Sequence, residues 1–317
     1  MQVSLKAGKN IIYRKSPLLS LNGYKKHLSL TIMFIPVVVF FAIFCYAPMY
    51  GIIIAFKNYK ITEGILHSPW VGFQHFEDIF RTFTFVRALK NTIIISLLKL
   101  MFGFPVPITL ALFLNELRNM KFKRVLQTVS YLPHFLSWVI LSGLFIFFLS
   151  PTTGPVNYVI SLFNIEPIYF LGDVKWFRFT LVITDIWKEM GWGSVIFLAT
   201  IAGINPELYE ASRCDGASRF QQAFFITLPQ LAPTITILLL LNIGKILNVG
   251  FDQVFNLYNA AVYETGDIID TYVYRRGLTQ MDYSAATAVG LFKNGIGFIL
   301  IIIMNSITKR INEYGIW

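Results

Sequence analysis

Long apolar runs alternate with polar connections along the chain. A transmembrane helix needs about 20 mostly apolar residues, and six runs are long enough, at residues 28–55, 89–115, 129–150, 178–203, 230–250 and 285–307. The pattern predicts an all-α polytopic membrane protein with six transmembrane helices. Pro36, Pro48, Pro105 and Pro107 lie inside these runs, where membrane helices tolerate proline because neighbouring groups satisfy the freed backbone carbonyls.

Basic residues in the connections predict the orientation. They concentrate in the N-terminal tail, in the loop 116–128 and at the C-terminus, as Lys6, Lys9, Arg14, Lys15, Lys25, Lys26, Arg118, Lys121, Lys123, Arg124, Lys309 and Arg310. With six spans these segments share one side, and the positive-inside rule makes that side the cytoplasm. We therefore expect both termini and the loop 204–229 to be cytoplasmic, and the loops 56–88, 151–177 and 251–284 to face outward.

Composition agrees with a membrane protein. Hydrophobic residues make up 55% of the 317 residues and charged residues 14%, against about a quarter charged in soluble domains. The net charge of +10 would suggest nucleic acid in a soluble protein, but here we expect membrane lipid and no nucleic acid as a partner. Cys45 and Cys214 are too few for a disulfide framework.

Aromatic residues gather in two of the predicted outer loops. Two interpretations remain open: an aromatic belt at the membrane interface, or a docking surface for an external partner. The residues are Trp70, Phe73, Phe76, Phe80, Phe83, Phe85, Tyr169, Phe170, Trp176 and Phe177.

The stretch 205–229 predicts two short helices on the cytoplasmic side. Asn205-Pro206-Glu207 is typical of a helix start, and Gly216 should break the first helix. A second helical piece should run over 217–227. Pro229 should end this piece and begin the next span. A short helix at the membrane surface can fit a groove on another protein.

The same stretch resembles a known family. Glu210-Ala211-Ser212, then Gly216, then Ile226-Thr227-Leu228-Pro229 matches the EAA signature of bacterial ABC importer permeases, except that Ser212 stands where alanine is usual. In that family the loop docks into a separate ATPase subunit. The resemblance therefore implies ATPase coupling by Glu210, Ala211, Ser212, Asp215, Gly216, Ala217, Ile226, Leu228 and Pro229.

Further segments extend the resemblance over most of the chain. Residues 70–76 and 88–92 look like the lead-in to the core of sugar importers, and 269–278 with 283–292 are similar to the LplB-like branch, whose members take up oligosaccharides and polysaccharide fragments. The resemblance implies a type I importer fold in the bacterial cytoplasmic membrane. It also implies an unlike second permease subunit, two ATPase subunits, an extracytoplasmic solute-binding protein and a carbohydrate substrate.

The resemblance also divides the chain. A basic cytoplasmic tail covers 1–27, the first span and outer loop 28–88, the permease core 89–307 with its coupling loop 205–229, and a C-terminal tail 308–317.

Motifs for catalysis are absent from the sequence. There is no phosphate-binding G-x-x-x-x-G-K-[ST] loop, no HExxH, no GxSxG and no Cys/His metal cluster. We therefore expect no enzyme activity, metal or cofactor on this chain, with ATP and Mg on the ATPase subunits. The histidines, His27, His67, His75 and His134, are scattered and are interpreted as interfacial.

Ionisable residues inside the spans mark a candidate substrate path, because charges in a membrane usually face a cavity or each other. The candidates are Asp185, Trp187, Lys188, Glu189, Asn242, Lys245, Asn248, Asp252, Lys293 and Asn294. Trp192 lies close by on the fourth span, and Lys99 lies near the middle of the second span. Asn242, Lys245, Asn248 and Asp252 are spaced by three, three and four residues, which predicts a polar stripe on the otherwise apolar helix of the fifth span. The competing interpretation is that the charges pair, for example Asp185 with Lys188.

Two other functions stay open at this point. Asp185, Glu189 and Lys245 are intramembrane charges that an ion-coupled secondary transporter could use. A membrane-embedded enzyme would need a nucleophile with a base, or a metal cluster, and neither is evident in the spans.

Overall fold

The computed structural model describes residues 28–312, and apart from one antiparallel bridge between Lys57 and Trp70 the regular structure of this range is helical. The chain divides into two compact units, residues 1–53 and 54–317. The predicted basic tail 1–27 lies outside the described residues. The last helix runs on to Asn312, five residues past the expected end of the last span at residue 307.

The first unit holds a single apolar helix. α2 (Leu28–Phe41) continues through a π-helical turn, η1 (Ala42–Tyr46), into the 3₁₀ helix η2 (Ala47–Phe56), whose last residues belong to the second unit. No residue of α2 is buried. A helix that is apolar on every side and exposed on every side suits a lipid environment.

The second unit contains the remaining helices. In chain order they are α3 (Gly64–His67), α4 (Gln74–Arg81), α5 (Phe83–Leu98), η3 (Lys99–Gly103), α6 (Pro105–Glu116), α7 (Met120–Tyr131), η4 (Leu132–Phe135), α8 (Trp138–Phe148), α9 (Pro155–Ser161), α10 (Val174–Ala202), α11 (Pro206–Cys214), α12 (Arg219–Gln222), η5 (Ala223–Thr227), α13 (Leu228–Gly244), α14 (Phe251–Leu257), η6 (Ala260–Val262), α15 (Tyr263–Gly266), α16 (Ile269–Tyr274), η7 (Arg275–Thr279) and α17 (Tyr283–Asn312).

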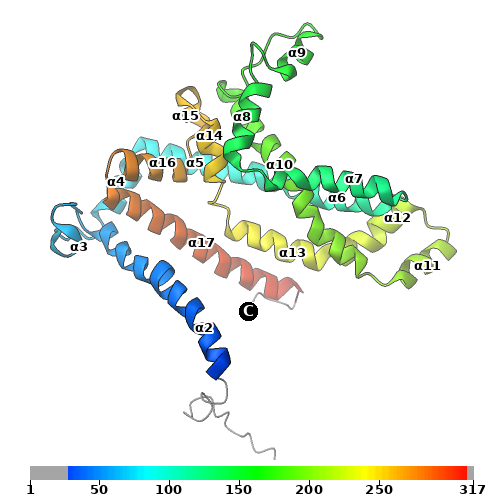
Figure 1. The fold of residues 1–317 in the computed structure, drawn as a ribbon, viewed down its shortest axis with the longest axis horizontal. Helices are drawn as coiled ribbons and strands as arrows, with labels where there is room; N and C mark the ends of the chain where they lie inside the picture. Colours follow the sequence, from blue (N-terminus) through cyan, green and yellow to red (C-terminus); the bar gives the residue numbers. More distant parts are fainter. Residues whose placement is uncertain (1–27, 313–317) are drawn as a thin grey trace, which may run out of the picture. The chain divides into compact units, whose positions relative to one another are not determined.

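Helix α10 is the centre of this unit. Figure 1 shows α6 and α7 running along it, while α13 lies beside α17. The contact between α6, α10 and α13 is an apolar core that includes Ala111, Phe197 and Leu231. The helices α14 and α15 lie near the first turns of α10, and α11 and α12 lie beyond its last turn (Figure 1).

Several apolar helices are long enough to cross a membrane. Among the described residues these are Leu28–Phe56, Phe83–Glu116, Arg219–Gly244 and Tyr283–Ile307, and α7 with α8 would make a fifth span if the bent pair counts as one. The expected span 178–203 overlaps α10, which is 29 residues long. α10 is not among these candidates, and Asp185, Lys188 and Glu189 lie on it.

The prediction of one helix over 129–150 is wrong. α7 ends at Tyr131, the chain makes a 3₁₀ turn, and α8 starts at Trp138, with a bend of 106° between the two. Pro133 cannot donate a backbone hydrogen bond, and Ser137 takes an extended conformation in which its hydroxyl caps α8 by accepting from the Ile140 N–H. Two sequence signals, a proline and an N-cap serine, therefore lie at the break.

Three prolines in the other spans follow π-helical turns. Such a turn lies just before Pro48, before Pro105 and before Pro229. The wider turn re-spaces the carbonyls at the point where proline removes a donor. The prediction that Pro229 ends a helical piece is therefore wrong, since the helix runs unbroken from Arg219 to Gly244.

Residues 251–284, predicted as an outer loop, form part of the packed core. Asn91 on α5 donates to the carbonyls of Glu264 and Asp267, at 3.0 Å each, and Arg178 on α10 donates to the Asn91 side chain at 2.8 Å. The Asp267 carboxylate is fully buried and lies 2.7 Å from Arg275. Burial disfavours the charge of Arg275, but the hydrogen bond and charge of Asp267 outweigh it and raise the pKa of Arg275.

The aromatic residues of the predicted outer loops differ in burial. Phe85 and Phe177 are fully buried core residues, whereas Trp70, Phe73 and Phe83 are exposed. Neither the belt nor the docking surface therefore describes all ten residues.

Close packing of α10 on α7 depends on a glycine and generates a prediction. A Cβ on Gly191 would lie 2.0 Å from the carbonyl oxygen of Ser130, so Gly191→Ala must push the two helices apart. We expect it to lower the free energy of unfolding by about 1–3 kcal/mol, measured by thermal unfolding in detergent.

The matched control for this prediction is Gly143→Ala on α8, where an added Cβ meets nothing within 4 Å. It should be neutral or slightly stabilising, because alanine is the better helix former. Equal melting temperatures for the two variants would contradict the packing argument.

Candidate functional site

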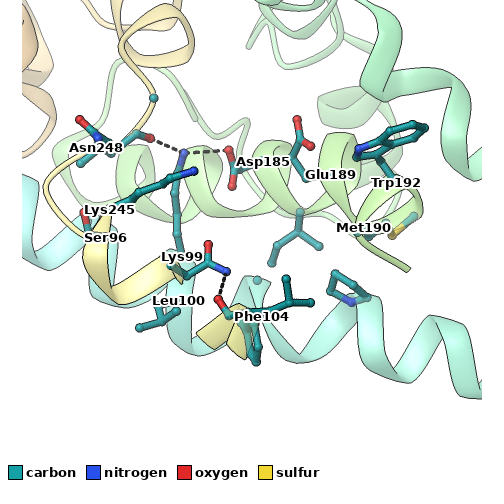
Figure 2. Close-up of a pocket in the computed structure, with 18 of the residues that line it drawn as sticks. Ser96, Lys99, Leu100, Phe104, Asp185, Glu189, Met190, Trp192, Lys245 and Asn248 are labelled. Carbon is teal, nitrogen blue, oxygen red and sulfur yellow. Dashed lines mark hydrogen bonds and ion pairs between the residues drawn. The ribbon is translucent and has the colours of Figure 1, made fainter. Parts of the chain in front are cut away.

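A pocket of about 550 Å³ lies in the second unit between three walls (Figure 2). The first wall is the stretch from α5 through η3 to α6, the second is α10, and the third is the end of α13 with the chain that follows it. Polar and charged side chains line it together with the indoles of Trp138 and Trp192. Its polar lining is Ser96, Lys99, Asp185, Glu189, Asn242, Lys245 and Asn248.

Lys99 joins the three walls. It lies on the π turn η3, and its ammonium donates to the Asp185 carboxylate on α10 at 2.8 Å, to the Val249 carbonyl at 2.8 Å and to the Gln253 side-chain oxygen. An ammonium has three donors, so all of them are used. The Gln253 amide in turn donates to the Leu181 carbonyl at 2.7 Å and the Thr184 hydroxyl at 2.8 Å, which returns the network to α10.

A second charged group lies where α10 passes the α7–α8 bend. Glu189 accepts from His134 at 2.8 Å and pairs with Lys188 at 3.4 Å. The buried Lys188 ammonium also donates to the backbone carbonyl of His134 at 2.7 Å, and the His134 ring stacks on Trp192 with 4.8 Å between ring centroids. The bend is therefore fastened to α10 by both the backbone and the side chain of His134.

The polar stripe predicted for the fifth span is not on one helix. α13 ends at Gly244, and the chain runs irregularly to Gly250, whose φ of 96° is in the left-handed region that favours glycine. Asp252 lies in the first turn of the next helix, α14, and does not line the pocket. Asn242, Lys245 and Asn248 still line the same pocket, because the irregular segment folds back over it.

Five of the ten candidate path residues line the pocket: Asp185, Glu189, Asn242, Lys245 and Asn248. The other five lie elsewhere. Trp187 packs edge-on against Phe145, Lys188 and Asp252 are placed as described above, Lys293 pairs with Asp270 on α16, and Asn294 is exposed. The competing interpretation, that the charges pair, holds for Asp185 with Lys99, Glu189 with Lys188 and Lys293 with Asp270. The pairing given as its example, Asp185 with Lys188, does not form.

Sequence reasoning missed several residues of the pocket network. Lys99 stood out only as a charge in a span, His134 was interpreted as interfacial, and Gln253 gave no signal because glutamine in a predicted loop is ordinary. Each acquires its role from a partner more than 50 positions away in the chain.

The stretch 205–229 forms two helices that meet at a glycine, as predicted. Asn205 caps α11 by accepting from the Glu207 N–H at 3.0 Å, Gly216 has a φ of 80°, and Ser218 with Gln221 forms a capping box at the start of α12. Capping residues satisfy the free donors of a helix start, so both helices of this stretch begin at defined points.

Polar contacts clamp the two helices together. The buried Gln222 amide donates to the Ser212 hydroxyl at 2.8 Å and to the Tyr209 carbonyl at 3.3 Å, and the hydroxyls of Tyr209 and Thr227 lie 2.9 Å apart. Ser212, the one departure from the EAA pattern, is thus the acceptor of this clamp, a role alanine could not take. Tyr209 and Gln222 were missed by the motif because they carry no part of it.

Most of the motif residues of this stretch are exposed. Glu210, Ala211, Asp215 and Gly216 are exposed, as is Pro229, and Ala217, Ile226 and Leu228 are half-buried. A second pocket of about 650 Å³ lies between this stretch and the end of α6. Its charged lining is Glu116, Arg118, Glu210, Arg213 and Arg219.

Comparisons with known proteins agree on one family. A model of the binding-protein-dependent transport system inner membrane component matches residues 103–313. Protein LplB of Bacillus subtilis is 44% identical over 99% of this chain and 96% of its own length. The polygalacturonan/rhamnogalacturonan transport system permease protein YteP of the same species is 45% identical over 91% of this chain and 90% of its own length.

A solved structure is also similar. A chain of the crystal structure of a bacterial alginate ABC transporter, in complex with an alginate pentasaccharide-bound periplasmic protein, aligns with a TM-score of 0.86. It is 42% identical, and the alignment covers 93% of this chain and 99% of that one.

The Lys99 junction generates a prediction. Lys99→Met leaves the Asp185 carboxylate, the Val249 carbonyl and the Gln253 oxygen without their shared donor. We expect a loss of about 2 kcal/mol in the free energy of unfolding, seen as a lower melting temperature of the purified protein. Lys90→Met, on the same helix but at an exposed position, should change it by less than about 0.5 kcal/mol, and equal effects of both variants would contradict the junction.

Proposed function

The chain belongs to the family of binding-protein-dependent transport system inner membrane components and is a multi-pass permease of an ABC importer; from that premise, we propose that its cargo is a carbohydrate, an oligosaccharide or a polysaccharide fragment. The observation that carries the cargo is the pocket, which combines amide and charged side chains with the indoles of Trp138 and Trp192. Hydroxyls of a sugar can bond the polar groups, and the apolar faces of its rings can stack on indoles.

Relatives support the same cargo class. Polygalacturonan, rhamnogalacturonan and alginate, named for two similar proteins, are all polysaccharides. Galactooligosaccharides are named for a further relative, GanP of Bacillus subtilis, at 29% identity.

The topology proposed is the one that the charges suggest. Six spans with both termini in the cytoplasm place Arg118, Lys121, Lys123 and Arg124 together with α11 on the cytoplasmic side. The length of α10 supports its assignment as a span, because 29 residues exceed what a bilayer needs. Its charged residues are tolerated there because Lys99, His134 and Lys188 pair with them.

The proposed complex divides the chemistry among its chains. An unlike second permease would complete the pathway, an extracytoplasmic solute-binding protein would deliver the sugar, and two ATPase subunits would bind ATP and Mg. This chain would bind no cofactor and hydrolyse nothing. Exposed Glu210, Ala211, Asp215 and Gly216 are the surface that we propose contacts an ATPase subunit.

Coupling follows from the connectivity. α11 and α12 join the end of α10 to the start of α13, and these two helices form two walls of the sugar pocket. A partner that moves the clamped α11–α12 pair must move those walls. ATP can shift the balance between two pocket shapes only if the ATPase contacts α11 differently in each.

An ion-coupled secondary transporter has less support. Such a carrier needs a carboxylate free to exchange its ion, but Asp185 is held by Lys99, and Glu189 by His134 and Lys188.

The proposal is tested by purifying the tagged chain gently from its native membranes. Recovery of an ATPase, a second permease and a solute-binding protein that binds sugars is the expected result. A chain that is recovered alone and still transports would contradict the importer.

Coupling through Gly216 generates a further prediction. Its φ of 80° strains any other residue, although an added Cβ would meet nothing within 4 Å, so substitutions test backbone conformation alone. Of the three replacements, asparagine tolerates this left-handed conformation best. For alanine the conformation costs roughly 1–2 kcal/mol, and proline cannot adopt it. We expect sugar uptake per ATP hydrolysed to fall in the order Gly216→Asn, Gly216→Ala, Gly216→Pro.

This series is measured in proteoliposomes containing the whole importer. The amount of complex inserted should stay constant, because the change lies outside the spans. Normal uptake by the Gly216→Pro variant would refute a coupling role for this turn.

A further inference from the structure

The charges of the sugar pocket do not all have partners. Four charged side chains line it: Lys99, Asp185, Glu189 and Lys245. Asp185 forms an ion pair with Lys99 at 2.8 Å. Glu189 pairs with His134 and with Lys188, neither of which lines the pocket. Lys245, an exposed residue, is the remaining one. Among the residues whose side chains the structure describes, none forms an ion pair or hydrogen bond with its ammonium.

The local charge of the pocket is therefore positive. The Lys99 and Asp185 charges cancel, and so do those of Glu189 and Lys188, which leaves the charge of Lys245. Its side chain extends from the end of α13 into the pocket (Figure 2). A cation that has no partner and faces a cavity attracts an anion that enters it.

From this balance we infer that the pocket is built for an acidic sugar, and that Lys245 determines this specificity by binding the sugar's carboxylate. The inference rests on the proposed function, since it names the class of carbohydrate carried. An ammonium and a carboxylate form a charge-assisted hydrogen bond, which is about twice as strong as a neutral one. A neutral sugar of the same shape gains no such bond.

Two amide side chains, Asn242 and Asn248, line the same pocket as Lys245. Asn248 makes no side-chain hydrogen bond within the described part of the chain, and Asn242 uses its N–H only toward the Leu238 carbonyl at 2.8 Å, so its oxygen is free. Trp192 lines the same pocket. The arrangement offers one charge for the carboxylate, amides for hydroxyls and an indole for a ring face.

Lys245 also has a simpler possible role. It directly follows the last turn of α13, where a cation stabilises the negative end of the helix dipole. That role predicts an effect on stability that does not depend on the ligand. The two roles therefore separate if binding of charged and uncharged sugars is measured on the same variants.

The experiment measures equilibrium binding to the whole purified importer, without its solute-binding protein, so that the selectivity of that protein does not enter. The probes are radiolabelled trigalacturonate and trimannuronate, each with its fully methyl-esterified form, which keeps the rings but removes the charge. The variants are Lys245→Gln, Lys245→Arg and, as a control with the same loss of charge at an exposed position outside the pocket, Lys90→Gln.

We expect the wild-type complex to bind at least one acidic trisaccharide at least tenfold more tightly than its ester. Lys245→Gln should lose about tenfold in affinity for the acid and none for the ester, Lys245→Arg should keep most of the preference, and Lys90→Gln should match the wild type.

The inference is overturned if the wild-type complex binds neither acid, if it binds acids and esters equally, or if Lys245→Gln weakens both alike. Each of these leaves the importer itself intact, provided that the complex still contains its ATPase and hydrolyses ATP. A chain that purifies without any ATPase would instead overturn the proposed function.

Discussion

One ammonium group holds the pocket together. The Lys99 ammonium donates to α10, to the chain after α13 and to the start of α14. Three walls that are far apart in the sequence therefore meet at one ammonium group. A charge inside a membrane protein is costly unless it is paired. The requirement to satisfy Lys99 therefore dictates where Asp185, Val249 and Gln253 must lie, and the pocket is the space left beside them.

The same pocket collects the irregular parts of the helices. Lys99 lies on a π turn, His134 lies at the bend between α7 and α8, and Val249 and Gly250 lie where α13 has ended. Irregular backbone frees polar groups that must find partners, and at membrane depth it is tolerated only inside protein or beside a cavity. The breaks thus supply part of the polar lining, including Lys99, Lys245 and Asn248, while Asp185 and Glu189 come from the regular helix α10.

Capping and clamping hydrogen bonds hold the stretch that joins α10 to α13. Caps at Asn205 and Ser218 and the clamp of Ser212, Tyr209 and Gln222 leave α11 and α12 little freedom to move separately. A rigid connector between α10 and α13 passes displacement to both pocket walls, whereas a loose one would absorb it. Serine in place of the usual alanine strengthens this connector, because its hydroxyl completes the hydrogen bonds of the buried Gln222.

The sequence by itself determined the helical membrane class, the capped pair of helices meeting at Gly216 and the family, because hydropathy, caps and a spaced motif are local signals. It also marked ten candidate path residues, five of which line the pocket. Only the tertiary structure decided which charges are paired and which one is not. It ends α13 at Gly244, bends the chain at Pro133 and pairs Asp185 with Lys99 instead of Lys188. Those outcomes depend on partners distant in the chain, and no local pattern encodes the distance between two charges on different helices.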